Sequence, residues 1–153
     1  MIKSSEFRMT RRLSKFGRRL TPVELKEATF YIDRVIDKEK EYGEIRYKVI
    51  GSQTTGISRS VKRDGWDLDI FVYEGLRDGK EFYLAGYLAT KVYESYPHLF
   101  EYDMIHVGSP GELRADLYFL IFREGKYKDL RIDFLDDYVF DKGAFSSLEE
   151  KWS

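Results

Sequence analysis

The spacing of apolar residues along the chain alternates between a period near 3.6 and a period of two, so it predicts both helices and strands. Helical spacing follows residues 21–24, Thr-Pro-Val-Glu, which combine a capping residue, a proline and an acid in the order typical of a helix start. We expect this helix to end near Gly43. Its inward face is expected to hold Leu25, Ala28, Thr29, Ile32, Val35 and Ile36.

Five shorter segments are apolar or alternate between apolar and polar residues, as strands do. They are residues 45–50, 66–72, 102–107, 117–122 and 130–135. A further helix is expected over residues 80–95, because it places Leu84, Leu88 and Val92 on one face. A short last helix is expected near residues 146–150. This order of elements predicts an α+β fold, in which helices flank a mixed β-sheet.

The first twenty residues differ from the others in charge. They hold seven basic side chains and one acidic side chain, whereas the whole chain has a net charge of −1. We therefore distinguish a basic arm, residues 1–20, from one domain, residues 21–153. The apolar residues of the arm share one face of a helix: Met9, Leu13, Phe16 and Leu20. Two interpretations stay open: the helix packs on the domain with its basic face in solvent, or it contacts RNA or a small protein partner.

Composition narrows the class of protein. The chain has no cysteine, which excludes disulfides and thiolate metal sites. It has no asparagine, one glutamine and 35% charged residues, which fits a thermophile, although chance or codon bias gives the same composition. No apolar run is long enough for a membrane span and no signal peptide is evident, so we expect a cytoplasmic protein. His98 and His106 lack zinc spacing and are expected to be structural.

Two aspartates interrupt the second predicted strand. Asp67 and Asp69 share a face of that strand, with their Cα atoms about 6.5 Å apart. Aspartate is disfavoured inside strands, so the pair needs a reason. Carboxylates at this spacing can converge on divalent ions, as two-metal phosphoryl transfer requires. The alternative is an exposed pair on an edge strand.

Two further features could complete a site of that kind. Gly51-Ser52 follows the first predicted strand, and a glycine there lets backbone amides approach phosphate oxygens. An ordinary turn would have the same sequence. Asp133 interrupts the last predicted strand on the face opposite its apolar residues. Asp129 and Asp136 are alternatives, but they lie at the strand ends, where an acid needs no special reason.

Three features of the chain together resemble the motifs of the DNA polymerase β-type nucleotidyltransferase superfamily. They are Gly51-Ser52, the Asp-Leu-Asp of residues 67–69, and Asp133. The chain is most similar to the catalytic head domain of archaeal CCA-adding enzymes, over roughly residues 20–140. The resemblance implies a palm-like nucleotidyltransferase fold. It implies that Gly51 and Ser52 hold a nucleoside triphosphate, that Asp67, Asp69 and Asp133 bind Mg²⁺ or Mn²⁺, and that Asp133 also helps to deprotonate the attacking hydroxyl. Basic residues of the loop would neutralise the triphosphate: Arg59, Lys62 or Arg63.

The sequence departs from that family in three places. The loop before Asp67 is long, residues 56–58 read Gly-Ile-Ser where Gly-Thr is usual, and no His-Pro-Tyr precedes Asp133. The chain also ends soon after Asp133, so CCA addition by this chain alone is not expected. We expect a minimal metal-dependent nucleotidyltransferase whose acceptor is RNA, a protein or a small molecule, including the toxin-type enzymes that modify a neighbouring protein or tRNA. The alternative is a non-catalytic module of the same fold that binds RNA or protein.

Overall fold

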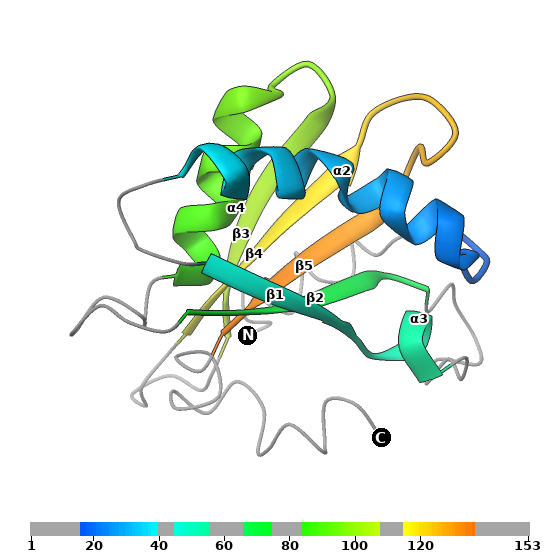
Figure 1. Cartoon of the computed structure of the whole chain (residues 1–153), viewed down its shortest axis with the longest axis horizontal. Helices are drawn as coiled ribbons and strands as arrows, with labels where there is room; N and C mark the ends of the chain where they lie inside the picture. The colour runs from blue at the N-terminus through cyan, green and yellow to red at the C-terminus, as the bar shows by residue number, and fades with distance from the viewer. Residues whose placement is uncertain (1–15, 40–44, 56–65, 75–83, 108–114, 137–153) are drawn as a thin grey trace, which may run out of the picture.

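The structure is a computed structural model of the whole chain that describes residues 16–39, 45–55, 66–74, 84–107 and 115–136 (Figure 1). Helices and strands are interleaved along the chain, which confirms the α+β class. The elements are α2 (Pro22–Lys38), β1 (Ile45–Ile50), α3 (Ser52–Thr55), β2 (Leu68–Glu74), α4 (Leu84–Ser95), β3 (Phe100–Val107), β4 (Ala115–Phe122) and β5 (Arg131–Leu135).

The five strands form one mixed sheet in the order β1-β2-β5-β4-β3. The last strand, β5, lies between β2 and β4, and it is parallel to β2 and antiparallel to β4. The β1/β2 and β3/β4 pairs are antiparallel. The sheet is therefore mixed, as predicted, and it brings the two strands that carry Asp69 and Asp133 into contact.

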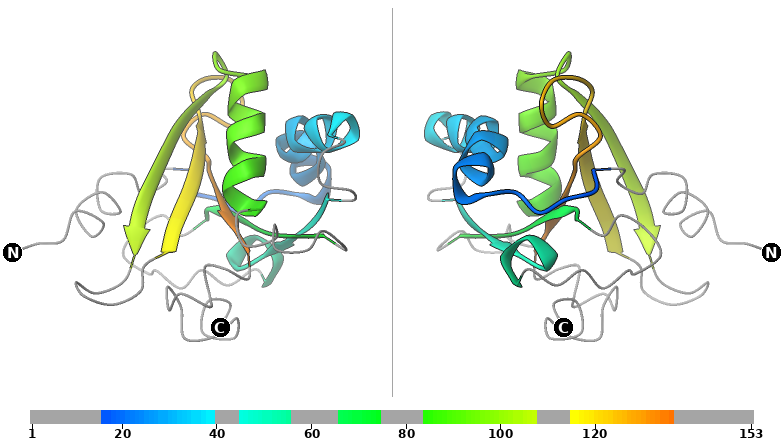
Figure 2. Two further views of the ribbon diagram at one scale, coloured as in Figure 1. Left: turned by 90° about the vertical axis from the view of Figure 1, so that its left-hand side faces the viewer. Right: turned by 90° about the vertical axis from the view of Figure 1, so that its right-hand side faces the viewer.

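Both long helices cover the same face of the sheet, as Figure 2 shows. Against them the strands bury apolar residues at every second position: Leu68, Ile70, Val72, Leu120, Phe122, Ile132 and Phe134. Because side chains alternate along a strand, Asp69 and Asp133 point to the opposite face. No helix in the described ranges is long and apolar enough to cross a membrane.

Helix α2 begins as the sequence predicts. The Thr21 hydroxyl accepts a hydrogen bond from the Glu24 amide (3.1 Å), and the Glu24 carboxylate accepts one from the Thr21 amide (3.0 Å), which completes the capping box. The inward positions Ala28, Thr29, Ile32 and Val35 are buried, while Leu25 and Ile36 pack against the core. The helix ends at Lys38, earlier than expected, because Glu39 adopts an extended conformation. Gly43, where we expected the helix to end, lies outside the described residues.

Residues 16–20 are not helical, contrary to the prediction for the arm. Phe16 and Leu20 are nevertheless buried, so the apolar positions pack on the domain without forming a helix there. The Leu20 amide donates to the side chain of Gln53, and Thr21 is extended before Pro22, which disfavours a helix through this segment. The rest of the arm, residues 1–15, and the expected helix at 146–150 lie outside the described residues.

Candidate functional site

Two of the three predicted aspartates lie side by side on the face of the sheet that the helices leave uncovered. Asp69 of β2 and Asp133 of β5 are register partners in the parallel pair, and their exposed fractions are only 5% and 6%. Asp67, which we expected within the second strand, lies one residue before β2 and is half-buried. We call Asp67, Asp69 and Asp133 the aspartate cluster.

Gly51 brings the Gly-Ser motif against this cluster. Its φ is +76°, a left-handed conformation that glycine adopts without strain. A Cβ atom at this position would lie 2.5 Å from Asp69 Oδ2. The register of the antiparallel pair explains the proximity, because Ile50, at the end of β1, is opposite Asp69. Gly51 and Asp69 belong to two separate motifs of the sequence, and the fold brings them into direct contact.

Arg131 is a member of the site that the sequence motifs did not identify. Its Nε donates to Asp133 Oδ1 (2.8 Å), and its Nη2 donates to Asp133 Oδ2 (3.2 Å) and to Asp67 Oδ2 (2.7 Å). The guanidinium carbon lies 4.4 Å from the ring centroid of Phe119. The signal was present in the strand pattern, because Arg131 is two residues before Asp133 and must share its face.

The charges of the site explain why a buried arginine is stable there. Arg131 is 4% exposed, and burial by itself would lower its pKa. The carboxylates of Asp133, Asp67 and Asp69 act in the opposite direction and raise the pKa of Arg131 above its usual value. The guanidinium therefore stays charged and offsets part of the repulsion among the three aspartates.

The arrangement in this structure does not fit a divalent metal ion. Within the described ranges, no three or more acidic or histidine side chains are placed to hold one. The physical reason is Arg131, whose Nη2 contacts both Asp67 and Asp133. The Mg²⁺ or Mn²⁺ implied by the family resemblance therefore stays a prediction. Arg59, Lys62 and Arg63 lie outside the described residues.

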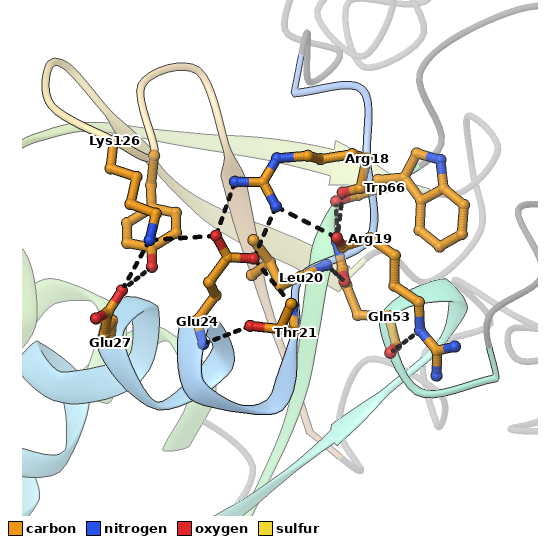
Figure 3. A network of polar contacts seen from close by, with 10 residues as sticks. Arg18, Arg19, Leu20, Thr21, Glu24, Glu27, Gln53, Trp66 and Lys126 are labelled. Atoms are coloured by element: carbon orange, nitrogen blue, oxygen red, sulfur yellow. Dashed lines mark hydrogen bonds and ion pairs between the residues drawn. The ribbon is translucent and has the colours of Figure 1, made fainter.

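Gln53 connects the segments that carry the predicted motifs, as Figure 3 shows. It is 1% exposed and belongs to α3, directly after Gly51-Ser52. Its Oε1 accepts a hydrogen bond from the Leu20 amide (2.7 Å), and its Nε2 donates to the Trp66 carbonyl (2.8 Å) and the Arg18 carbonyl (3.3 Å). Since Trp66 directly precedes Asp67, Gln53 holds the Gly-Ser turn, the end of the arm and the entry to β2 together.

The end of the basic arm is also held by its arginines. Arg19 donates to the backbone carbonyls of Gln53 (3.1 Å) and Thr54 (2.8 Å) at the end of α3. Arg18 forms two hydrogen bonds with Glu24, of 2.7 and 2.9 Å, and Lys126 approaches the same carboxylate at 3.3 Å (Figure 3). These contacts give two of the arm's seven basic residues a structural role within the domain.

The fold also decides among the acids near β5. Asp129 lies in the turn before β5 with a φ of 72°, which aspartate tolerates better than most residues. Asp136 is buried after β5, where its Oδ2 accepts a hydrogen bond from the Ala85 amide (2.8 Å) in the first turn of α4. Asp133 is therefore the acid of this segment that reaches the aspartate cluster. His98 is exposed in the turn before β3, and it is part of no metal-ligand group among the described residues.

Comparison with known proteins adds similarities of fold alone. No family model matches the chain, and no curated protein matches it. One similar solved structure is the non-canonical poly(A) polymerase complex GLD-2–GLD-3, with a TM-score of 0.47 and 11% identity over 88% of this chain. The GLD-2/RNP-8 complex has a TM-score of 0.46 and 12% identity over 78% of this chain. The chain spans 40% of the length of each matched chain, and similarities of this size assign no role to any residue.

Proposed function

We propose that this protein is a nucleotidyltransferase that transfers a nucleoside monophosphate from a nucleoside triphosphate to a hydroxyl acceptor. The acceptor oxygen forms a bond to the α-phosphorus, the bond from that phosphorus to the β-phosphate oxygen breaks, and pyrophosphate leaves. The hydroxyl proton passes to a base. The observation that carries the proposal is the contact between Gly51 and Asp69 at the point where Asp69 pairs with Asp133.

This placement supports the following roles for the predicted residues. Gly51 and Ser52 would hold the triphosphate, because Gly51 has no side chain and its backbone lies directly against the Asp69 carboxylate. The aspartate cluster would face the α-phosphate. Arg59 and Lys62 of the loop would neutralise the triphosphate, and the basic arm would contact an RNA acceptor. Arg131 contacts two of the three carboxylates that would bind a metal ion.

The proposal is tested by incubating the full chain with labelled ATP, CTP, GTP or UTP, Mg²⁺ or Mn²⁺, and bulk RNA. We expect labelled RNA from the unmodified protein and none from Asp69→Asn. Asp129→Asn is the matched control, because it makes the same chemical change in a turn where asparagine tolerates the positive φ of 72°. Absence of product with all four nucleotides, or full activity in Asp69→Asn, would contradict the proposal.

A non-catalytic binding module is the second candidate, and the ion pairs of Arg131 favour it. They give Asp67 and Asp133 a purely structural use that needs no nucleotide. This candidate predicts RNA binding that weakens steeply between about 50 and 200 mM salt, since counterions are released from the phosphates. It also predicts that no label is transferred and that Asp69→Asn binds RNA as the unmodified protein does. Label transfer that requires Asp69 would exclude it.

A further inference from the structure

One nitrogen atom of Arg131 lies between two of the three carboxylates that the family resemblance assigns to a metal. Nη2 is 2.7 Å from Asp67 Oδ2 and 3.2 Å from Asp133 Oδ2. Nε holds the other oxygen of Asp133 at 2.8 Å. Three of the four oxygens of Asp67 and Asp133 are thus in contact with a single positive charge.

This charge is held firmly in place. The guanidinium is planar and donates two hydrogen bonds to the same carboxylate, a geometry that lysine or a hydrated ion cannot copy. The ring of Phe119 covers one side of it, with 4.4 Å from Cζ to the ring centroid. Both ion-paired partners on β5 are nearly inaccessible, with side-chain exposures of 5% for Arg131 and 8% for Asp133.

A divalent ion cannot bridge Asp67 Oδ2 and Asp133 Oδ2 while the guanidinium contacts both oxygens. Mg²⁺ binds carboxylate oxygens at about 2.0–2.1 Å and demands near-octahedral geometry, so it would have to enter the space that Nη2 now fills. The divalent ion and the guanidinium would also repel each other strongly if both were held beside the same carboxylates in a buried site. Binding of one therefore requires the other to move away from Asp67 and Asp133.

We propose that Arg131 is the resident cation of the aspartate cluster and that a divalent cation binds only when the guanidinium leaves Asp67 and Asp133. Arg131 thereby sets the affinity of this site for divalent cations. The inference concerns cation binding alone and holds whether or not the protein transfers nucleotides. A nucleotide-transfer assay that finds no product therefore does not contradict this inference. A cation-binding experiment that contradicts the inference does not contradict the proposed function.

The test measures Mn²⁺ binding to the full chain by the electron paramagnetic resonance signal of the free ion. Arg131→Gln removes the charge, and Arg123→Gln is the matched control, because Arg123 is an exposed arginine that donates to the Phe100 carbonyl away from the cluster. We expect Arg131→Gln to bind Mn²⁺ about tenfold more tightly or better than the unmodified protein, since a competing charge is gone. The control should match the unmodified protein. Equal or weaker binding by Arg131→Gln overturns the proposal.

Removing a buried charge can also prevent folding, so a second measurement uses the unmodified chain. Nitrogen-15 NMR follows the Nε–H of Arg131 while Mg²⁺ is added, and carbon-13 NMR follows the carboxyl carbons of Asp67 and Asp133. We expect the Nε–H signal to move, and its slow exchange with water to be lost, over the same concentrations that shift the carboxyl signals. Carboxyl signals that shift while the Arg131 signal stays unchanged would overturn the proposal.

Discussion

The carboxylate of Asp69 lies where the side chain of any residue other than glycine at position 51 would begin. A Cβ atom on Gly51 would be 2.5 Å from Asp69 Oδ2, closer than carbon and oxygen atoms can approach without bonding. The backbone of Gly51 is also left-handed, with a φ of +76°. Two independent requirements, one of conformation and one of space, therefore demand glycine beside the aspartate cluster.

Replacing Gly51 by alanine tests the second requirement. Gly125→Ala is the matched control, because Gly125 has a φ of +87° but no atom within 4 Å of the position that a Cβ would take. Alanine in a left-handed conformation costs about 1–2 kcal/mol at either position. We expect Gly51→Ala to lower the free energy of unfolding by about 1–3 kcal/mol more than Gly125→Ala, since overpacking adds to the strain. Urea denaturation measures the free energy of unfolding of both variants. Equal decreases would show that the contact with Asp69 is unimportant.

The aspartates of the cluster are expected to differ in what they contribute to stability. Asp133 accepts two hydrogen bonds from the buried Arg131, whereas the charge of Asp69 raises the pKa of Arg131 from a greater distance. Asp133→Asn should lower the free energy of unfolding by about 3 kcal/mol, because it leaves a buried charge poorly compensated. Asp69→Asn should lower it by less than Asp133→Asn does, because the two hydrogen bonds to the buried guanidinium are kept. Chemical denaturation of the two variants gives the comparison, and a larger loss in Asp69→Asn would contradict it.

Gln53 should be more important for stability than its place in a one-turn helix suggests. Gln53→Ala removes the partners of the Leu20 amide and the Trp66 carbonyl. A buried polar group left without a partner costs about 1–3 kcal/mol, so we expect a loss of about 2 kcal/mol or more. Thr54→Ala serves as the control, since Thr54 is exposed and contributes its backbone carbonyl to Arg19. Thermal unfolding that is equally affected by both changes would argue against this role for Gln53.

Glu24 should make stability depend on pH. Its hydrogen bonds with Arg18 and with the Thr21 amide hold the pKa of Glu24 well below its usual value of 4.5 in the folded protein. A carboxylate with a lowered folded pKa contributes stability above its unfolded pKa, and that contribution is lost as the pH falls toward the folded value. The unmodified protein should therefore resist urea better than Glu24→Gln at about pH 7, and the difference should shrink below about pH 4. A difference that grows on acidification would contradict this.

The elements of the fold were largely predictable because each depends on local pattern. The strand at residues 45–50 and the capping box at Thr21 and Glu24 match the structure, since alternation and capping are properties of a few consecutive residues. The helix expected through residues 16–20 is absent because a distant residue, Gln53, binds the Leu20 amide. Contacts of this kind leave no periodic signal in the sequence.

Some features of the candidate site were likewise predictable from local pattern, and others were not. Alternation along single strands was enough to separate Asp69 and Asp133 from the apolar core, and Gly51-Ser52 could be identified as a turn after a strand. Only the tertiary structure decided that β5 pairs with β2, that Asp133 rather than Asp129 or Asp136 joins Asp69, and that Arg131 contacts the cluster. The physical reason is that strand order and ion pairing depend on how distant segments pack, whereas the face on which a side chain lies depends only on its neighbours along the strand.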